Sequence, residues 1–151
     1  MQSGTGELRI SELTPLMIAC IMGKLSMVKK IVESARPNLK PEHFALFINI
    51  KVTKNLGGNN ALLYAISSSS NSASSSPKKA DQSLEIVKYL IKVANADPDS
   101  MNDYNVNCLI LASKKSQIGV IEMLINCGVN IGCTDSNGNN ALHIACQGGN
   151  S

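Results

Sequence analysis

Apolar residues recur along this chain in one short phrase that occurs four times. Each copy starts with a polar residue and continues through five mostly apolar residues to an alanine. The four copies cover residues 14–19, 60–65, 107–112 and 140–145. A Thr or Asn before such a run is a good helix N-cap, because its side-chain oxygen accepts a hydrogen bond from the first turn. The pattern therefore predicts four short helices.

A second phrase follows each of the first three copies. Its apolar residues recur at i, i+3, i+6 and i+7, which places them on one face of a helix. The three sets are Leu25, Val28, Ile31 and Val32, then Leu84, Val87, Leu90 and Ile91, then Ile118, Ile121, Leu124 and Ile125. A repeated pair of helices predicts a solenoid in which successive pairs stack on one another.

The repeat length can be measured between equivalent leucines. Leu109 and Leu142 are 33 residues apart, whereas the two preceding intervals are 46 and 47 residues. The longer intervals require two insertions, which we place at residues 35–54 and 67–82. Glycine and asparagine, which tolerate a left-handed backbone, stand at the expected turn positions. These residues are Gly58, Asn105 and Gly138 before the first helices, and Asn95 and Gly128 after the second helices.

Residues 128–145 resemble the pattern G-A-D-V-N-x-x-D-x-x-G-x-T-P-L-H-x-A of the ankyrin-repeat family. The resemblance implies an all-α solenoid of stacked helix-turn-helix units whose connecting turns project as fingers. It also implies a structural hydrogen bond between repeats at His143, the histidine of T-P-L-H. The expected organisation is an N-terminal tail or cap at 1–11 and repeats at 12–34, 55–101, 102–134 and 135–151, the last one truncated.

The two insertions differ in character. Residues 35–54 contain both phenylalanines of the protein, Phe44 and Phe47. Pro41 near a first turn favours a short extra helix there, although residues 47–52 also alternate like a strand. The phenylalanines could seal the end of the first repeat or form a patch for a partner. Residues 67–82 are rich in serine, which predicts a disordered loop. Within it, Ser76-Pro77-Lys78-Lys79 resembles a proline-directed kinase site, so Ser76 is a candidate phosphorylation site; the alternative is a simple spacer.

Composition narrows the range of functions. A net charge of +3 and 3% aromatic residues argue against a nucleic-acid partner. No apolar run is long enough to cross a membrane, and the polar N-terminus does not resemble a secretory signal. We therefore expect an intracellular protein, cytoplasmic or nuclear, and a monomer.

The chemistry-bearing residues do not form a known catalytic pattern. Five cysteines and two histidines offer one candidate metal set, Cys127, Cys133, His143 and Cys146, but its spacing does not match a paired C-x-x-C site. We expect reduced thiols, no metal, no cofactor and no enzymatic activity.

The resemblance implies a non-catalytic protein–protein interaction module that binds a partner through the concave face of its repeats. The expected partner-binding residues are Ile21, Met22, Asp103, Tyr104, Val106, Lys114, Lys115, Ser136, Asn137 and Asn139. Tyr104 is the expected anchor, because exposed aromatic residues dominate binding hot spots. The two lysines suggest an acidic contact on the partner. Because the last repeat lacks its second helix, we also consider a recruiting or regulatory segment at the N-terminus of a larger enzyme or channel.

Overall fold

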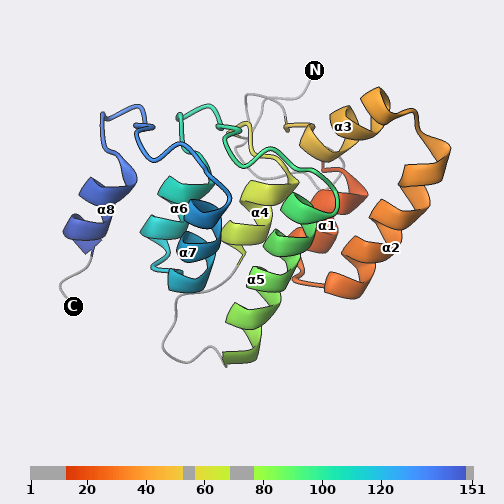
Figure 1. Cartoon of the computed structure of the whole chain (residues 1–151), viewed down its shortest axis with the longest axis horizontal. Coiled ribbons are helices and arrows are strands. Elements are labelled where there is room, and N and C mark those ends of the chain that lie inside the picture. The colour runs from red at the N-terminus through yellow and green to blue at the C-terminus, as the bar shows by residue number, and fades with distance from the viewer. Residues whose placement is uncertain (1–12, 53–56, 69–76, 149–151) are drawn as a thin grey trace, which may run out of the picture.

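Helices in two layers make up this protein, as the computed structural model shows for residues 13–52, 57–68 and 77–148 (Figure 1). The first layer contains α1 (Pro15–Ile21), α4 (Ala61–Ser67), α6 (Cys108–Lys114) and α8 (Ala141–Gly148). The second layer contains α2 (Leu25–Ala35), α5 (Pro77–Lys92) and α7 (Ile118–Asn126). Within each layer, every helix packs against the next one along the chain. The predicted all-α solenoid of stacked helix pairs is confirmed.

Each first-layer helix starts at the polar residue that the sequence pattern marks. The side-chain oxygens of Asn60, Asn107 and Asn140 each accept a hydrogen bond of 2.9 Å from the backbone N–H three residues later. Thr14 does the same at 3.2 Å. These bonds satisfy N–H groups that have no partner inside the helix. Asparagine thus replaces threonine without loss of the cap.

The core is aliphatic and runs between the two layers. Leu16, Leu62 and Leu109, the equivalent leucines of the first three repeats, are at most 2% exposed. In the fourth repeat Leu142 is 69% exposed, because no helix in the described part of the chain packs on that side of α8. Ile144 of the same helix is buried, because α8 packs against α6.

The last second-layer helix departs from the predicted apolar stripe. Ile118 and Ile125 of α7 are 70% and 47% exposed, and α7 buries Val120, Met123 and Leu124 instead. In α5 the equivalents of the two isoleucines, Leu84 and Ile91, are half-buried in the core. The helical period was therefore correct, but it did not show that one side of α7 has no neighbour within the described residues.

The first insertion contains a helix. It is α3 (Pro41–Asn49), preceded by a short 3-10 helix, η2 (Arg36–Asn38). Of the strand-like alternation, only an isolated bridge between Lys51 and Asn60 is present in the described residues. Phe44 is 8% exposed and Phe47 is half-buried beside it, with ring centroids 6.4 Å apart. Phe44 therefore belongs to the core and not to an exposed patch.

The second insertion is shorter than its composition indicated. Helix α5 begins at Pro77, so the prediction of a loop through residue 82 was wrong for residues 77–82. Proline suits the first position of a helix, because its fixed φ is helical and its missing N–H is not needed there. The rest of the serine run, with the candidate phosphorylation site Ser76, lies outside the described residues, as does the N-terminal segment 1–12.

The cysteines are free thiols in two environments. Burial raises the pKa of the Cys20 thiol to about 12, and burial also raises the pKa of Cys108, with a smaller contribution from Asp97 and Asp99. Because the thiolate is the reactive form, a pKa raised by about three units lowers its population at pH 8 by a factor on the order of 10³.

We therefore predict that Cys20 and Cys108 react with a thiol reagent only after unfolding. In a variant carrying Cys127→Ser, Cys133→Ser and Cys146→Ser, titration with Ellman's reagent at pH 8 should give almost no reaction in buffer. Two equivalents should appear in concentrated urea. Rapid reaction of both thiols in the folded variant, with its circular dichroism unchanged, would contradict the burial of these helices.

Candidate functional site

The turns before α6 and α8, residues 102–107 and 135–140, share one organisation, and we call them finger turns. In the first, Asn102 Oδ1 accepts hydrogen bonds from the N–H groups of Tyr104 and Val106, at 2.9 and 3.0 Å. This asparagine also donates from Nδ2 to Asn59 Oδ1 at 3.0 Å. A single side chain therefore closes the turn and ties it to the preceding repeat.

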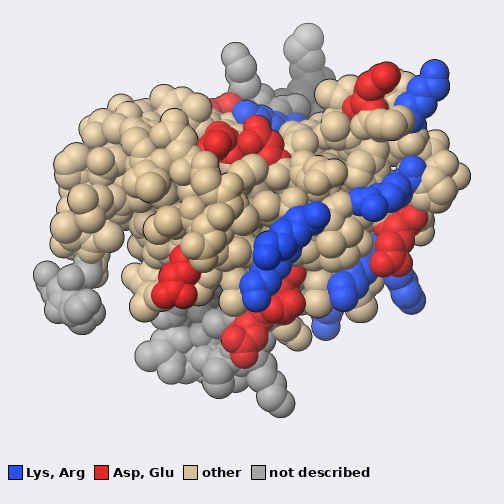
Figure 2. Space-filling model, in the orientation of Figure 1, with Lys and Arg blue, Asp and Glu red and all other residues tan. Residues whose placement is uncertain are grey.

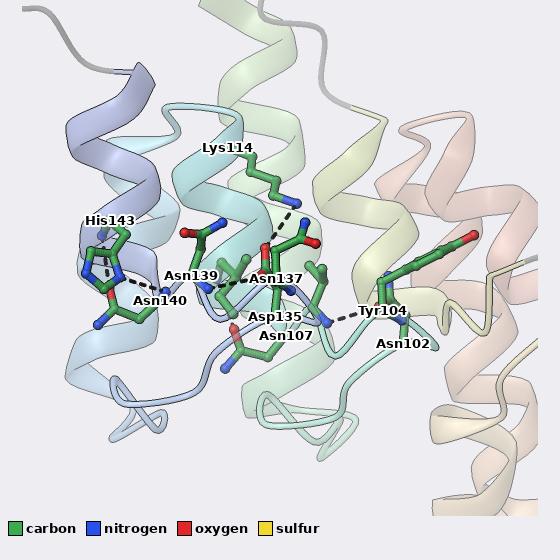
Figure 3. Close-up of polar contacts among 11 residues, drawn as sticks. Asn102, Tyr104, Asn107, Lys114, Asp135, Asn137, Asn139, Asn140 and His143 are labelled. Atoms are coloured by element: carbon green, nitrogen blue, oxygen red, sulfur yellow. Dashed lines mark hydrogen bonds and ion pairs between the residues drawn. The ribbon is translucent and has the colours of Figure 1, made fainter.

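Asp135 has the same role 33 residues later. Its Oδ1 accepts from the N–H groups of Asn137 and Asn139, at 3.0 and 2.9 Å (Figure 3). Asp135 is buried, and its other oxygen lies 3.9 Å from Lys114 Nζ of α6. Hydrogen bonds from backbone amides stabilise a buried carboxylate directly, whereas an ion pair of this length with a half-exposed lysine adds little.

Left-handed residues stand where the sequence predicts them. Asn105 and Gly138 have φ of 58° and 80°, and Gly58 has φ of 68° at the equivalent point of the preceding turn. At Gly58 a Cβ atom would lie 3.1 Å from the backbone nitrogen of Asp103 and would displace the side chain of that residue, but the left-handed backbone is the main reason for glycine here.

One hydrogen bond recurs between consecutive turns, joining the turn before α4 to the first finger turn and the first finger turn to the second. The N–H of Asp103 donates to the carbonyl of Gly57 at 3.0 Å, and the N–H of Ser136 donates to the carbonyl of Tyr104 at 2.9 Å. The two bonds occupy equivalent positions, one repeat apart. The turns therefore form a continuous row along one edge of the stacked helices (Figure 1).

Tyr104 is the most prominent residue of this row. Its side chain is 60% exposed, although both its N–H and its carbonyl are hydrogen-bonded. The ring rests beside Gly57, where an added Cβ would lie 3.5 Å from the ring. Figure 3 shows it extending away from Asp135. A rigid backbone thus presents an accessible aromatic ring.

The other expected binding residues fall into three groups. Met22, Asp103, Lys114, Ser136 and Asn137 are exposed, and Ile21, Lys115 and Asn139 are half-buried. Val106 is only 5% exposed and belongs to the core, so our expectation that it offers contact surface was wrong. Ile21 and Met22 lie at the end of α1, and α4 separates that helix from α6. The structure therefore does not bring these two residues together with the others.

A shallow hollow of about 390 Å³ lies between α6, the second finger turn and α8. Its lining comprises Ser113, Lys114, Asp135, Asn137, Asn139, Ile144, Gln147 and Gly148. Our list of expected partner-binding residues contained Lys114, Asn137 and Asn139 of this lining and omitted the other five, Asp135 among them. Asp135 could have been found from its 33-residue distance to Asn102, because the two side chains close equivalent turns.

The exposed His143 acts within its own helix start. Its Nδ1 accepts from the N–H of Asn140 at 3.3 Å, while Asn140 Oδ1 accepts from the N–H of His143. The resemblance implied a hydrogen bond from His143 to a neighbouring repeat. In the described residues, His143 instead bonds to Asn140 of its own helix start. The described residues contain no group of three or more His, Cys, Asp or Glu side chains that could hold a metal ion.

Two family models agree with this architecture. A family model of ankyrin repeats in three copies matches residues 78–151, and a model of a single ankyrin repeat matches residues 11–41. None of the curated proteins compared with the chain matches it. The chain belongs to the ankyrin-repeat family. Ankyrin repeats are in general protein–protein interaction modules, and proteins of this family are typically not enzymes. Among the described helices, none has the length and apolar character needed to cross a membrane.

Proposed function

We propose that this chain is a non-catalytic module that binds a protein partner. The binding surface, which we call the finger face, consists of the two finger turns and the hollow between α6 and α8. It corresponds to the concave face through which ankyrin repeats usually bind. Tyr104 is the anchor, and Lys114, Asn137 and Asn139 line the adjoining hollow.

The observation that carries this proposal is the exposure of Tyr104 on a turn whose backbone is already fixed. Asn102 holds the N–H of Tyr104, and Ser136 holds its carbonyl. Binding to a preordered surface avoids the entropy cost of ordering a loop. Tyrosine contributes a large contact area with few rotatable bonds, which explains its frequency at hot spots.

The charges of the hollow favour a largely neutral, polar partner surface beside the tyrosine. Lys114 faces the buried carboxylate of Asp135, so its charge is partly compensated within the protein. The remaining polar lining is dominated by amides, including Asn137, Asn139 and Gln147. Lys115 has no ion pair among the described residues and is the better candidate for an acidic contact on the partner.

The module is proposed to act inside the cell as a monomer. Cys127 and Cys146 are exposed free thiols, which a reducing compartment preserves. Light scattering of the reduced protein at micromolar concentration measures the mass of one chain if this part of the proposal is correct.

Affinity capture from native extract, followed by titration of the captured protein, tests the finger face. Tyr104→Ala should weaken binding by about 30-fold or more, as expected for a hot spot worth about 2 kcal/mol. Tyr104→Phe should keep most of the affinity, because it retains the ring. Lys92→Gln on α5, outside the finger face, is the matched surface control. Equal affinity of wild type and Tyr104→Ala would contradict the proposed binding surface.

A further inference from the structure

A second, shallow and wide-open depression lies at the other end of the molecule, between α2 and the inserted helix α3, and we call it the groove. This groove has a volume of about 520 Å³. Its floor is apolar and includes Ile31, Ala35, Leu39 and Phe47, and Lys30 is the charged residue of its lining. Because α3 belongs to the insertion, a regular ankyrin repeat would lack this groove.

Helix α3 also has an exposed apolar stripe that continues the groove. Leu46 and Ile50, beside it, are 69% and 48% exposed, and Phe47 is half-buried. Together with His43 these residues recur at i, i+3, i+4 and i+7, so they share one helical face. The opposite face of α3 buries Phe44 and Ile48 in the core. The stripe is therefore additional to the residues that hold α3 in place.

This end of the molecule is basic. Residues 24–49 contain five Lys or Arg and two Glu side chains. Figure 2 shows most of the basic side chains over α2, α3 and α5, with acidic side chains among them, whereas the surface around α8 in this view is almost free of charge.

Not all of these charges are available to the groove. Lys29 lies 5.8 Å from the ring centroid of Tyr89, and Arg36 donates a hydrogen bond to the carbonyl of Val93. Glu33 shares their side of α2 by helical spacing. Lys30 remains in the groove lining, and Lys40 stands at the start of α3, one turn before His43. Glu42 is the acidic residue in the first turn of α3, close to Lys40 in the sequence.

We propose that the groove between α2 and α3 binds an acidic amphipathic helix of a protein partner. Apolar side chains of that helix, spaced at i and i+3 or i+4, enter between α2 and α3 and contact Phe47 and Ile31. Carboxylates on its flanks meet Lys30 and Lys40. This recognition mode combines an apolar groove, which supplies affinity, with a charged rim, which selects the partner and its direction. The groove is distinct from the finger face, so the chain would hold two partners, or two parts of one partner, at once.

Selection from a display library of 16-residue peptides tests this proposal. The library contains amphipathic helices with the same apolar positions and either Glu or Lys on the polar positions. We expect the wild-type chain to enrich the acidic members. Lys30→Glu should weaken their binding about fivefold, a typical effect for a surface charge pair, and Phe47→Ala about tenfold or more. Lys24→Glu, the same charge change just before α2 and outside the groove lining, should leave the affinity unchanged.

Circular dichroism and thermal melting of each variant confirm that it is folded before binding is measured. The proposal is overturned if no acidic peptide is enriched, or if the enriched peptides are lost on Tyr104→Ala but not on Lys30→Glu. Binding of the chain to phosphatidylserine vesicles that depends on Lys30 and Phe47, with no peptide enriched, would assign the groove to a membrane surface instead. Because Tyr104 is not part of the groove, its substitution separates a failure here from a failure of the finger face.

Discussion

Substitution of Leu109 by alanine should lower the free energy of unfolding by about 2–5 kcal/mol. Leu109 lies on α6, is 2% exposed, and belongs to the core between the helices that flank α6. The change removes apolar contacts and leaves a cavity that closely packed helices can fill only in part. Since domains of this size are stable by about 5–15 kcal/mol, urea unfolding should show a large shift of the midpoint.

Leu142→Ala is the matched control, because Leu142 occupies the same position one repeat later. It is 69% exposed, so its truncation should change the free energy of unfolding by less than about 0.5 kcal/mol. Equal losses for the two variants would mean that the exposed side of α8 is covered in solution. Repeating the measurement at several protein concentrations would then show whether a second copy covers it.

Asp135→Ala should cost about 2–3 kcal/mol, the largest effect that we expect from a polar substitution. The N–H groups of Asn137 and Asn139 would lose their common acceptor, and the carboxylate is buried. Each such hydrogen bond contributes about 0.5–1.5 kcal/mol, and more where the acceptor is charged, so the loss of two accounts for this figure. Urea unfolding measures the loss, and hydrogen exchange at the two amides should accelerate in the variant.

Asp135→Asn is the control for this prediction. Asn102 shows that an asparagine oxygen can accept both backbone hydrogen bonds at the equivalent position. The variant should lose only the 3.9 Å pair with Lys114, which contributes about 0–1 kcal/mol. If the asparagine variant is as unstable as the alanine variant, the charge of Asp135 matters more than the two hydrogen bonds.

The helix pairs and their caps could be predicted from the sequence because both depend on local patterns. Asn60, Asn107 and Asn140 act within one helical turn, and the left-handed positions Asn105 and Gly138 reflect backbone conformation alone. Such features recur with the repeat and need no knowledge of distant neighbours. The exposed Tyr104 could be found for the same reason, because a repeat pattern places it at a turn.

Features that depend on neighbouring elements were not predictable in this way. Val106 looked like a turn residue, yet it packs into the core, and Asp135 was overlooked although it closes a turn. Ile118 continued the apolar period of its helix, but whether it is covered depends on what packs beside α7. Pro77 is a local signal for a helix start, and the serine-rich composition around it concealed that signal.

The finger turns separate the residues that hold the backbone from those that meet the solvent. Asn102 and Asp135 are the first residues of the two turns, and Asn107 and Asn140 are the last. The three residues that follow Asn102 or Asp135 form the tip of each turn. We therefore expect that the tripeptides 103–105 and 136–138 can be exchanged between the two turns without loss of the fold. Either tripeptide could be moved to the other turn while the frame around it stays intact. An interaction surface of this kind can be given a new specificity at the first two positions of each tip, with the left-handed third residue and the helices left as they are.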